Sequence, residues 1–155
     1  MSANGKERIA VVGIGNLLMS DDGVGVHVVQ ALQERNLENV ELIDAGTAVL
    51  HTADCLRGVD LVVVVDALQA GREPGTVYLM SGSDAVENDY GLSVHSLGLK
   101  TALNFLAPGE LPAEWTVVGV EPETVEQGMG LSEAVRAAVP GAVRTVENLI
   151  EEWRA

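Results

Sequence analysis

The stretch Val59-Asp-Leu-Val-Val-Val-Val-Asp66 decides the fold of this chain. Its four consecutive valines are poor helix formers, because branching at Cβ restricts their rotamers in a helix, and they favour the pleated surface of a sheet. A continuous apolar run, in place of an alternating one, is typical of a strand that is buried on both faces. We therefore expect a central strand over 59–66 that ends on the carboxylate of Asp66.

Four further strands are expected around this one, and helical patterns alternate with most of them. The predicted strands cover 8–13, 40–44, 76–80 and 115–120. Helices are predicted from Asp21 or Asp22, over 47–56, over 95–106, as a short helix after the N-cap Ser132, and over 143–153 beyond a break at Pro140-Gly141. Alternation of strands and helices favours right-handed crossovers and a parallel sheet. We predict a single α/β domain over 1–155, a three-layer sandwich whose twisted, mostly parallel five-stranded sheet is flanked by helices, with residues 1–7 flexible.

The net charge of the chain excludes some classes of binding partner. Nine Lys and Arg stand against 23 Asp and Glu, a net charge of −14, so phosphate backbones and anionic lipid surfaces would repel it. The longest aliphatic run, Leu61–Val65, is far shorter than the roughly 20 residues of a membrane-spanning helix. We predict neither nucleic-acid binding nor membrane insertion.

The N-terminus and the cysteine content suggest a cellular setting. Residues 1–8 carry charges and no apolar leader, and a single cysteine, Cys55, excludes an internal disulfide. We predict a cytoplasmic protein in which Cys55 is a buried small hydrophobe. The amphipathic helices show no extra apolar face for a permanent partner, which favours a monomer.

The glycine-rich segment 13–25 follows the first strand but does not fit a dinucleotide fingerprint, because Leu18 stands at the third glycine position. It ends instead in Asp21 and Asp22 beside a predicted helix start. One interpretation is that these aspartates cap the helix and complement its dipole; the other is that they bind a metal.

Acidic residues at two more strand ends favour the second interpretation. Asp44 and Asp66 close their strands, and the carboxyl ends of parallel strands line one crevice. Several carboxylates in one crevice repel each other, so a bound cation or raised pKa values are expected there. Asp44 could also act only as a turn former. His95, after a polar loop and at a helix start, would add an imidazole, and such an oxygen and nitrogen set suits nickel, zinc or manganese. His27 and His51 lie in predicted helices and are expected to be incidental.

At this point the sequence resembles a known family, the nickel-iron hydrogenase maturation endopeptidases. The resemblance runs along nearly the whole chain and is carried by Gly13-Ile-Gly-Asn-Leu-Leu-Met-Ser-Asp-Asp-Gly-Val-Gly25, Asp44-Ala-Gly-Thr47, Asp66-Ala67, Ser93-Val-His-Ser-Leu-Gly98, Val118-Gly-Val-Glu-Pro122 and Gly130-Leu-Ser132. It implies a peptide-bond hydrolase that removes a C-terminal extension from the precursor of the hydrogenase large subunit after nickel insertion.

The resemblance also implies which residues act. Asp22, Asp66 and His95 match the family's metal-contacting triad, Asp22 in a position where many members have glutamate, and Asp44 is a secondary candidate. The nickel is expected to arrive with the substrate, and another divalent cation could occupy the site in isolation. The cation could polarise the scissile carbonyl or activate water, or a carboxylate could act as general base. Two other functions stay open: a nickel-sensing or scaffold protein of hydrogenase assembly that cuts nothing, and, more distantly, a nucleotide-binding domain.

Overall fold

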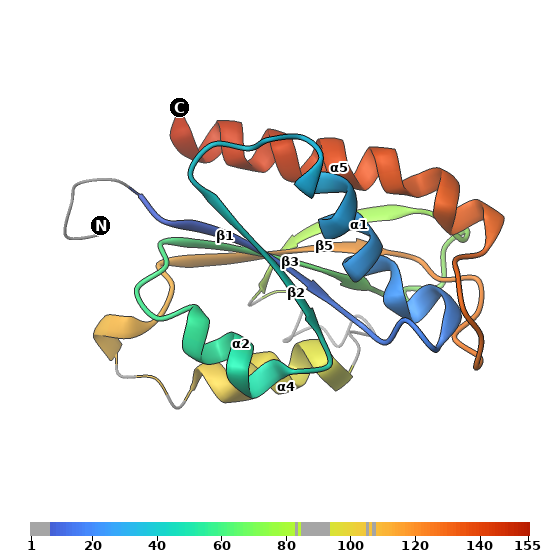
Figure 1. The fold of residues 1–155 in the computed structure, drawn as a ribbon, viewed down its shortest axis with the longest axis horizontal. Helices are drawn as coiled ribbons and strands as arrows, with labels where there is room; N and C mark the ends of the chain where they lie inside the picture. The colour runs from blue at the N-terminus through green and yellow to red at the C-terminus, as the bar shows by residue number, and fades with distance from the viewer. Residues whose placement is uncertain (1–6, 83, 85–93, 105, 107) are drawn as a thin grey trace.

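The computed structural model describes residues 7–82, 84, 94–104, 106 and 108–155 (Figure 1). The expected flexibility of residues 1–7 concerns a segment of which only residue 7 is described. The polar loop expected before His95 covers residues 81–91, and most of it also lies outside the described residues.

The described residues form one five-stranded sheet. Its strands are β1 (Ile9–Ile14), β2 (Val40–Gly46), β3 (Leu61–Ala67), β4 (Val77–Ser81) and β5 (Glu114–Val120), in the order β2-β1-β3-β5-β4. All neighbours pair in parallel except β4, which pairs with β5 in antiparallel orientation. The valine run forms β3, in the centre of the sheet, and every residue of β3 is buried. The predicted mostly parallel five-stranded sheet is confirmed.

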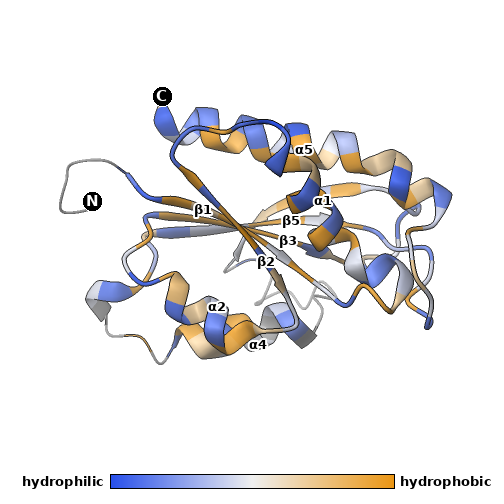
Figure 2. Cartoon of the chain, in the orientation of Figure 1, coloured by the Kyte–Doolittle hydropathy of each residue, from blue (hydrophilic) through white to orange (hydrophobic). Residues whose placement is uncertain are grey.

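Helices cover both faces of this sheet, so the three-layer sandwich is confirmed. The helical elements are η1 (Ser20–Gly23), α1 (Val24–Gln33), α2 (Val49–Cys55), α4 (Val94–Leu103), η2 (Pro108–Glu110) and α5 (Glu133–Arg154). Figure 1 shows α1 and α5 on one face and α2 and α4 on the other. Each face has its own core cluster, and in Figure 2 the apolar sides of the helices turn toward the strands. Burial of both faces explains the continuous apolar run of β3.

The break predicted at Pro140-Gly141 is wrong, because α5 is one helix from Glu133 to Arg154 with Pro140 inside it. Pro140 is exposed, whereas the buried side of the helix runs from Val135 to Ile150 along the sheet. A proline costs a helix one backbone hydrogen bond and some bending. Packing of an apolar face of this length outweighs that local cost.

The burial predicted for Cys55 is also wrong. Cys55 is the last residue of α2 and is exposed, with its Sγ 3.8 Å from Nε2 of His51 one turn earlier. The buried positions on this segment are Thr52, Ala53 and Leu56. These three lie on the side of the helix that faces the sheet, and helical periodicity turns Cys55 away from it.

No helix in the described part of the chain is long and apolar enough to span a membrane.

Candidate functional site

The candidate site lies where β1 and β3 end and η1 begins. Gly15 has a φ of +138°, and a Cβ on it would overlap the carbonyl oxygen of Asp22. A Cβ on Gly25, in the first turn of α1, would overlap the carbonyl oxygen of Val65 on β3. Only glycine allows these approaches, so the glycines of segment 13–25 let η1 and α1 pack directly over the strand ends. They serve the packing of the chain on itself, and this packing places Asp22 at the carboxyl edge of the sheet.

The two adjacent aspartates have different environments, and neither caps α1 with its side chain. Asp21 is fully buried. Its carboxylate accepts hydrogen bonds from the amides of Glu123 (2.9 Å), Thr124 (3.1 Å) and Ser132 (2.8 Å) and from the Ser132 hydroxyl (2.8 Å). Ser132 in turn caps α5 through Val135 N, as predicted. Asp21 therefore fastens the loop after β5 and the start of α5 to η1.

Asp22 faces the predicted histidine. Its Oδ2 accepts a hydrogen bond from the amide of Asn16 at 2.9 Å and lies 3.9 Å from Nε2 of His95, the second residue of α4. The side chains of Asp22 and His95 are 18% and 24% exposed, respectively. The fold thus brings an acid from η1 and an imidazole from α4 together in a place that water or a ligand can reach, and the catalytic or metal-binding role of this pair stays a prediction.

Asp66 is the second-last residue of β3, which runs over Leu61–Ala67 and not over the expected 59–66, and it is fully buried. Its Oδ1 accepts from the amide of Ala67 at 2.8 Å, and its Oδ2 accepts from the hydroxyl of Ser96 at 2.6 Å. Ser96 follows His95 in α4, so this hydrogen bond ties the helix that carries the imidazole to the end of β3. Ser96 stands in the motif 93–98, but its contact with Asp66 joins positions 30 residues apart and has no signal in the sequence.

Asp44 lies on the edge strand β2, opposite Gly13 of β1. Its side chain is exposed, and among the described residues it has neither a hydrogen bond nor an ion pair. The positive φ in its motif belongs to Gly46, at +55°, and Ala45 adopts an ordinary backbone conformation. A role for Asp44 in the site stays a prediction.

Asp22 and His95 supply only part of the ligand set that a bound metal ion needs. Two donors that each lie about 2.1 Å from one cation are at most about 4.2 Å apart, so the 3.9 Å between Asp22 Oδ2 and His95 Nε2 allows both to bind it. Among the described residues, however, no group of three or more His, Cys, Asp or Glu side chains is arranged to hold a metal. The pair fits a cation that brings other ligands with it better than one held by this chain alone.

A third buried carboxylate, Glu121, for which the sequence carries no clear signal, supports the same edge of the sheet. Oε1 of Glu121 accepts hydrogen bonds from the amides of Ala70 and Arg72 and from the hydroxyl of Tyr78 at 2.6 Å. Burial pushes the pKa of Glu121 up, but the Tyr78 and amide hydrogen bonds outweigh burial and lower it. Burial and the same carboxylate raise the pKa of Tyr78 to about 12. Glu121 thus joins the turn after β3 to β4.

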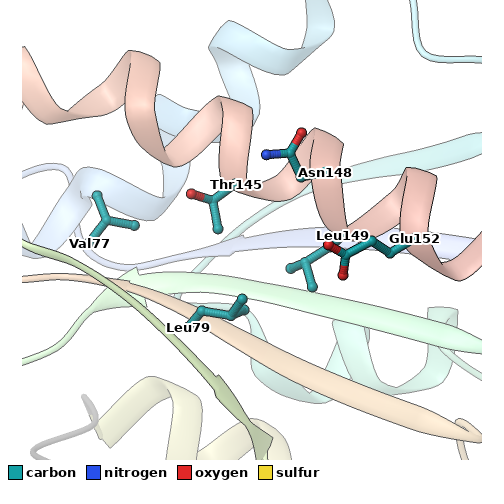
Figure 3. Close-up of a pocket in the computed structure, with 6 residues that line it drawn as sticks. All are labelled: Val77, Leu79, Thr145, Asn148, Leu149 and Glu152. Atoms are coloured by element: carbon teal, nitrogen blue, oxygen red, sulfur yellow. The ribbon is translucent and has the colours of Figure 1, made fainter.

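One pocket of about 330 Å³ lies away from these residues, between β4 and α5 (Figure 3). Val77 and Leu79 line it from the sheet and Thr145, Asn148, Leu149 and Glu152 from the helix. It contains no predicted site residue.

Fold and site together define an α/β protein with a partly exposed acid and histidine pair at the carboxyl edge of its sheet. The family model described as hydrogenase maturation protease matches residues 26–149. The chain belongs to the hydrogenase maturation protease family, and it is a peptidase.

Individual relatives agree with this assignment. Hydrogenase 2 maturation protease of Escherichia coli is 34% identical over 151 residues, which cover 94% of this chain and 92% of the relative. Among solved structures, the hydrogenase-maturating endopeptidase HybD from Escherichia coli has a TM-score of 0.84 at 33% identity, covering 94% of this chain and 93% of that one. The maturation protease HybD from Thermococcus kodakarensis has a TM-score of 0.74 at 29% identity, over 92% and 98%.

Proposed function

We propose that this protein is the endopeptidase that removes the C-terminal extension from the precursor of a nickel-iron hydrogenase large subunit after nickel insertion. In this proposal Asp22 and His95 contact nickel that the precursor already carries, and buried Asp66, the third residue of the expected triad, supports His95 from behind. Relatives named hydrogenase maturation protease support the substrate class. The observation that carries the rest is the acid and histidine pair, 3.9 Å apart and partly exposed.

The incomplete donor set explains why the metal would belong to the substrate. A resident catalytic metal site usually has three protein ligands, whereas the described residues offer two that solvent reaches. A nickel ion held by the precursor would bring its own ligands, and Asp22 and His95 would add to them. An empty precursor would lack this contact, so cleavage would wait for nickel insertion.

The different exposures of Asp22, His95 and Asp66 suit different roles in peptide hydrolysis. Peptide hydrolysis adds water to the scissile carbonyl carbon, breaks the C–N bond and moves a proton to the departing amine. Asp22 and His95 are exposed enough to contact substrate and to exchange protons with it. Buried Asp66, which accepts from Ser96, would keep α4 and therefore His95 in position. The substrate's nickel would supply Lewis acidity near the carbonyl.

The decisive experiment measures the intact mass of a cognate precursor, with and without nickel, before and after incubation with the wild type. We expect loss of one C-terminal peptide from the nickel-loaded form only. Asp22→Asn and His95→Ala should abolish this loss, whereas His51→Ala, a change of an exposed histidine on α2, should leave it intact. Cleavage of the nickel-free precursor at the same rate would refute the role of the metal.

The same experiment decides the second candidate function, a nickel-sensing or scaffold protein. Both functions use the same pair of residues, and the family assignment favours the enzyme. Binding of the nickel-loaded precursor without any change in its mass would favour the sensor. For either function we propose a monomer acting in the cytoplasm, in line with its single cysteine, which is free.

A further inference from the structure

Exposed apolar side chains gather on two loops beside the site. Seven large apolar side chains are exposed among the described residues, and four of them belong to these loops. The first loop, 16–20, joins β1 to η1 and carries Leu17 and Leu18; the second, 123–129, follows β5 and carries Val125 and Met129. Leu18 is 59% and Met129 82% exposed. Water-exposed groups of this size mark an interaction surface when they are clustered.

Backbone hydrogen bonds hold the two loops side by side. The amide of Gly128 donates to the carbonyl of Leu18, and the amide of Ser20 donates to the carbonyl of Gly128, both at 2.8 Å. The hydroxyl of Ser20 also donates to the carbonyl of Glu126 at 2.8 Å, and the buried carboxylate of Asp21 fastens the start of the second loop. The apolar side chains therefore stand on a braced platform, which loses little freedom when a partner binds.

This platform is continuous with the candidate site. Asn16, whose amide donates to the Asp22 carboxylate, directly precedes Leu17. Leu17 in turn packs closely on Gly23: a Cβ added to Gly23 would lie 3.1 Å from Cδ2 of Leu17. The first loop therefore begins directly beside the Asp22 carboxylate.

The charged side chains on the two loops themselves are acidic, and the first cation after the second loop, Arg136, lies beside the carbonyl of Leu131 at 3.5 Å. The sequence has no Lys or Arg from 9 to 34 or from 101 to 135, the segments that contain both loops. Glu123 and Glu126 are exposed on the second loop, and Asp22 stands beside the first. Apolar groups next to negative charge attract a segment that is apolar and flanked by cations.

We propose that the platform formed by loops 16–20 and 123–129 docks the segment of the precursor next to the scissile bond, and that this segment carries apolar side chains flanked by Lys or Arg. This inference rests on the proposed function and adds to it a surface and a sequence requirement for the substrate. Leu18 and Met129 supply the apolar contact, and Glu123 and Glu126 supply the attraction.

The test compares steady-state cleavage of nickel-loaded precursor, and its dissociation constant, for the wild type and Leu18→Ser/Met129→Ser. We expect KM and Kd to rise about tenfold or more, because burying two large side chains accounts for at least that factor, and kcat to change little. Leu79→Ser is the matched control. Leu79 is 53% exposed and lines the pocket between β4 and α5, away from the platform (Figure 3). The KM of the Leu79→Ser variant should therefore equal that of the wild type.

A second variant tests the charge. Glu123→Gln/Glu126→Gln should raise KM at low salt and flatten its salt dependence, because fewer charges remain to be screened. Equal KM and Kd for the wild type and Leu18→Ser/Met129→Ser would overturn the docking surface while leaving the proposed function intact. Precursor that binds without being cut would overturn the proposed function, and the Kd values of the variants would still decide the surface.

Discussion

Asp21 and Asp22 are adjacent residues of the same type, but their environments predict that substituting them will affect different properties of the protein. Asp21 is fully buried and accepts four hydrogen bonds that join η1 to the loop after β5 and to the start of α5. Asp22 is partly exposed and accepts one hydrogen bond, from the amide of Asn16. We expect Asp21→Ala to damage stability and Asp22→Asn to damage activity.

The size of the stability loss follows from the hydrogen bonds. A hydrogen bond to a charged group contributes about 1.5–3 kcal/mol, and leaving its donor buried without a partner adds to the loss. Water will reach some of the donors freed by Asp21→Ala, so we take about 4 kcal/mol for the whole group, below the simple sum. For a domain of this size that lowers Tm by roughly 10 °C. Asp22→Asn keeps an oxygen for the Asn16 amide and should cost less than about 1 kcal/mol.

Urea unfolding followed by far-ultraviolet circular dichroism measures both free energies, and precursor cleavage measures activity. Asp22→Asn should unfold like the wild type and fail to cleave. A loss below about 1 kcal/mol for Asp21→Ala would refute the assignment of Asp21 as the tie between η1 and α5. A loss for Asp22→Asn as large as that for Asp21→Ala would equally refute the contrast.

Three further predictions concern the frame around the site. Gly25→Ala should cost about 3 kcal/mol of unfolding free energy or prevent folding, because the new Cβ would overlap a carbonyl oxygen of β3. Gly141→Ala should instead stabilise the protein by about 0.5–1 kcal/mol, because Gly141 lies within α5 and, apart from its immediate neighbours and the helix backbone, no atom stands within 4 Å of the new Cβ. Urea unfolding of the two variants measures both changes. Ser96→Ala removes a buried hydrogen bond to the carboxylate near the end of β3 and should cost about 1–3 kcal/mol and slow cleavage, which urea unfolding and the precursor cleavage assay measure. Tyr78→Phe should lower Tm at pH 8. Because folding raises the pKa of Tyr78 to about 12, the stability it contributes is complete below its usual value of 10 and is lost as the pH rises through 12, so the Tm difference between variant and wild type should shrink between pH 10 and 12. A Tm difference that stayed constant over that range would contradict the Tyr78 assignment.

Much of the fold is predictable from local pattern. The valine run has few conformational choices, and the strands around it are bounded by glycine, proline and aspartate that end regular structure. The predicted break at Pro140 is wrong because it rests only on the local effect of proline on a helix and ignores tertiary packing. The apolar side of α5 from Val135 to Ile150 packs on the sheet, and this packing outweighs one lost hydrogen bond. Cys55 fails for a related reason, since residue type alone does not reveal which side of a short helix faces the core.

The site divides in the same way. The sequence by itself determined that Asp22, Asp66 and His95 stand at strand and helix ends on the carboxyl edge of a parallel sheet, because chain order and handed crossovers dictate that edge. Only the tertiary structure decided that Asp22 faces His95 while Asp21 is buried, and that Ser96 holds Asp66. The partners of Asp21 lie more than 100 residues away along the chain. The direction of a side chain depends on such distant contacts, and no local pattern encodes them.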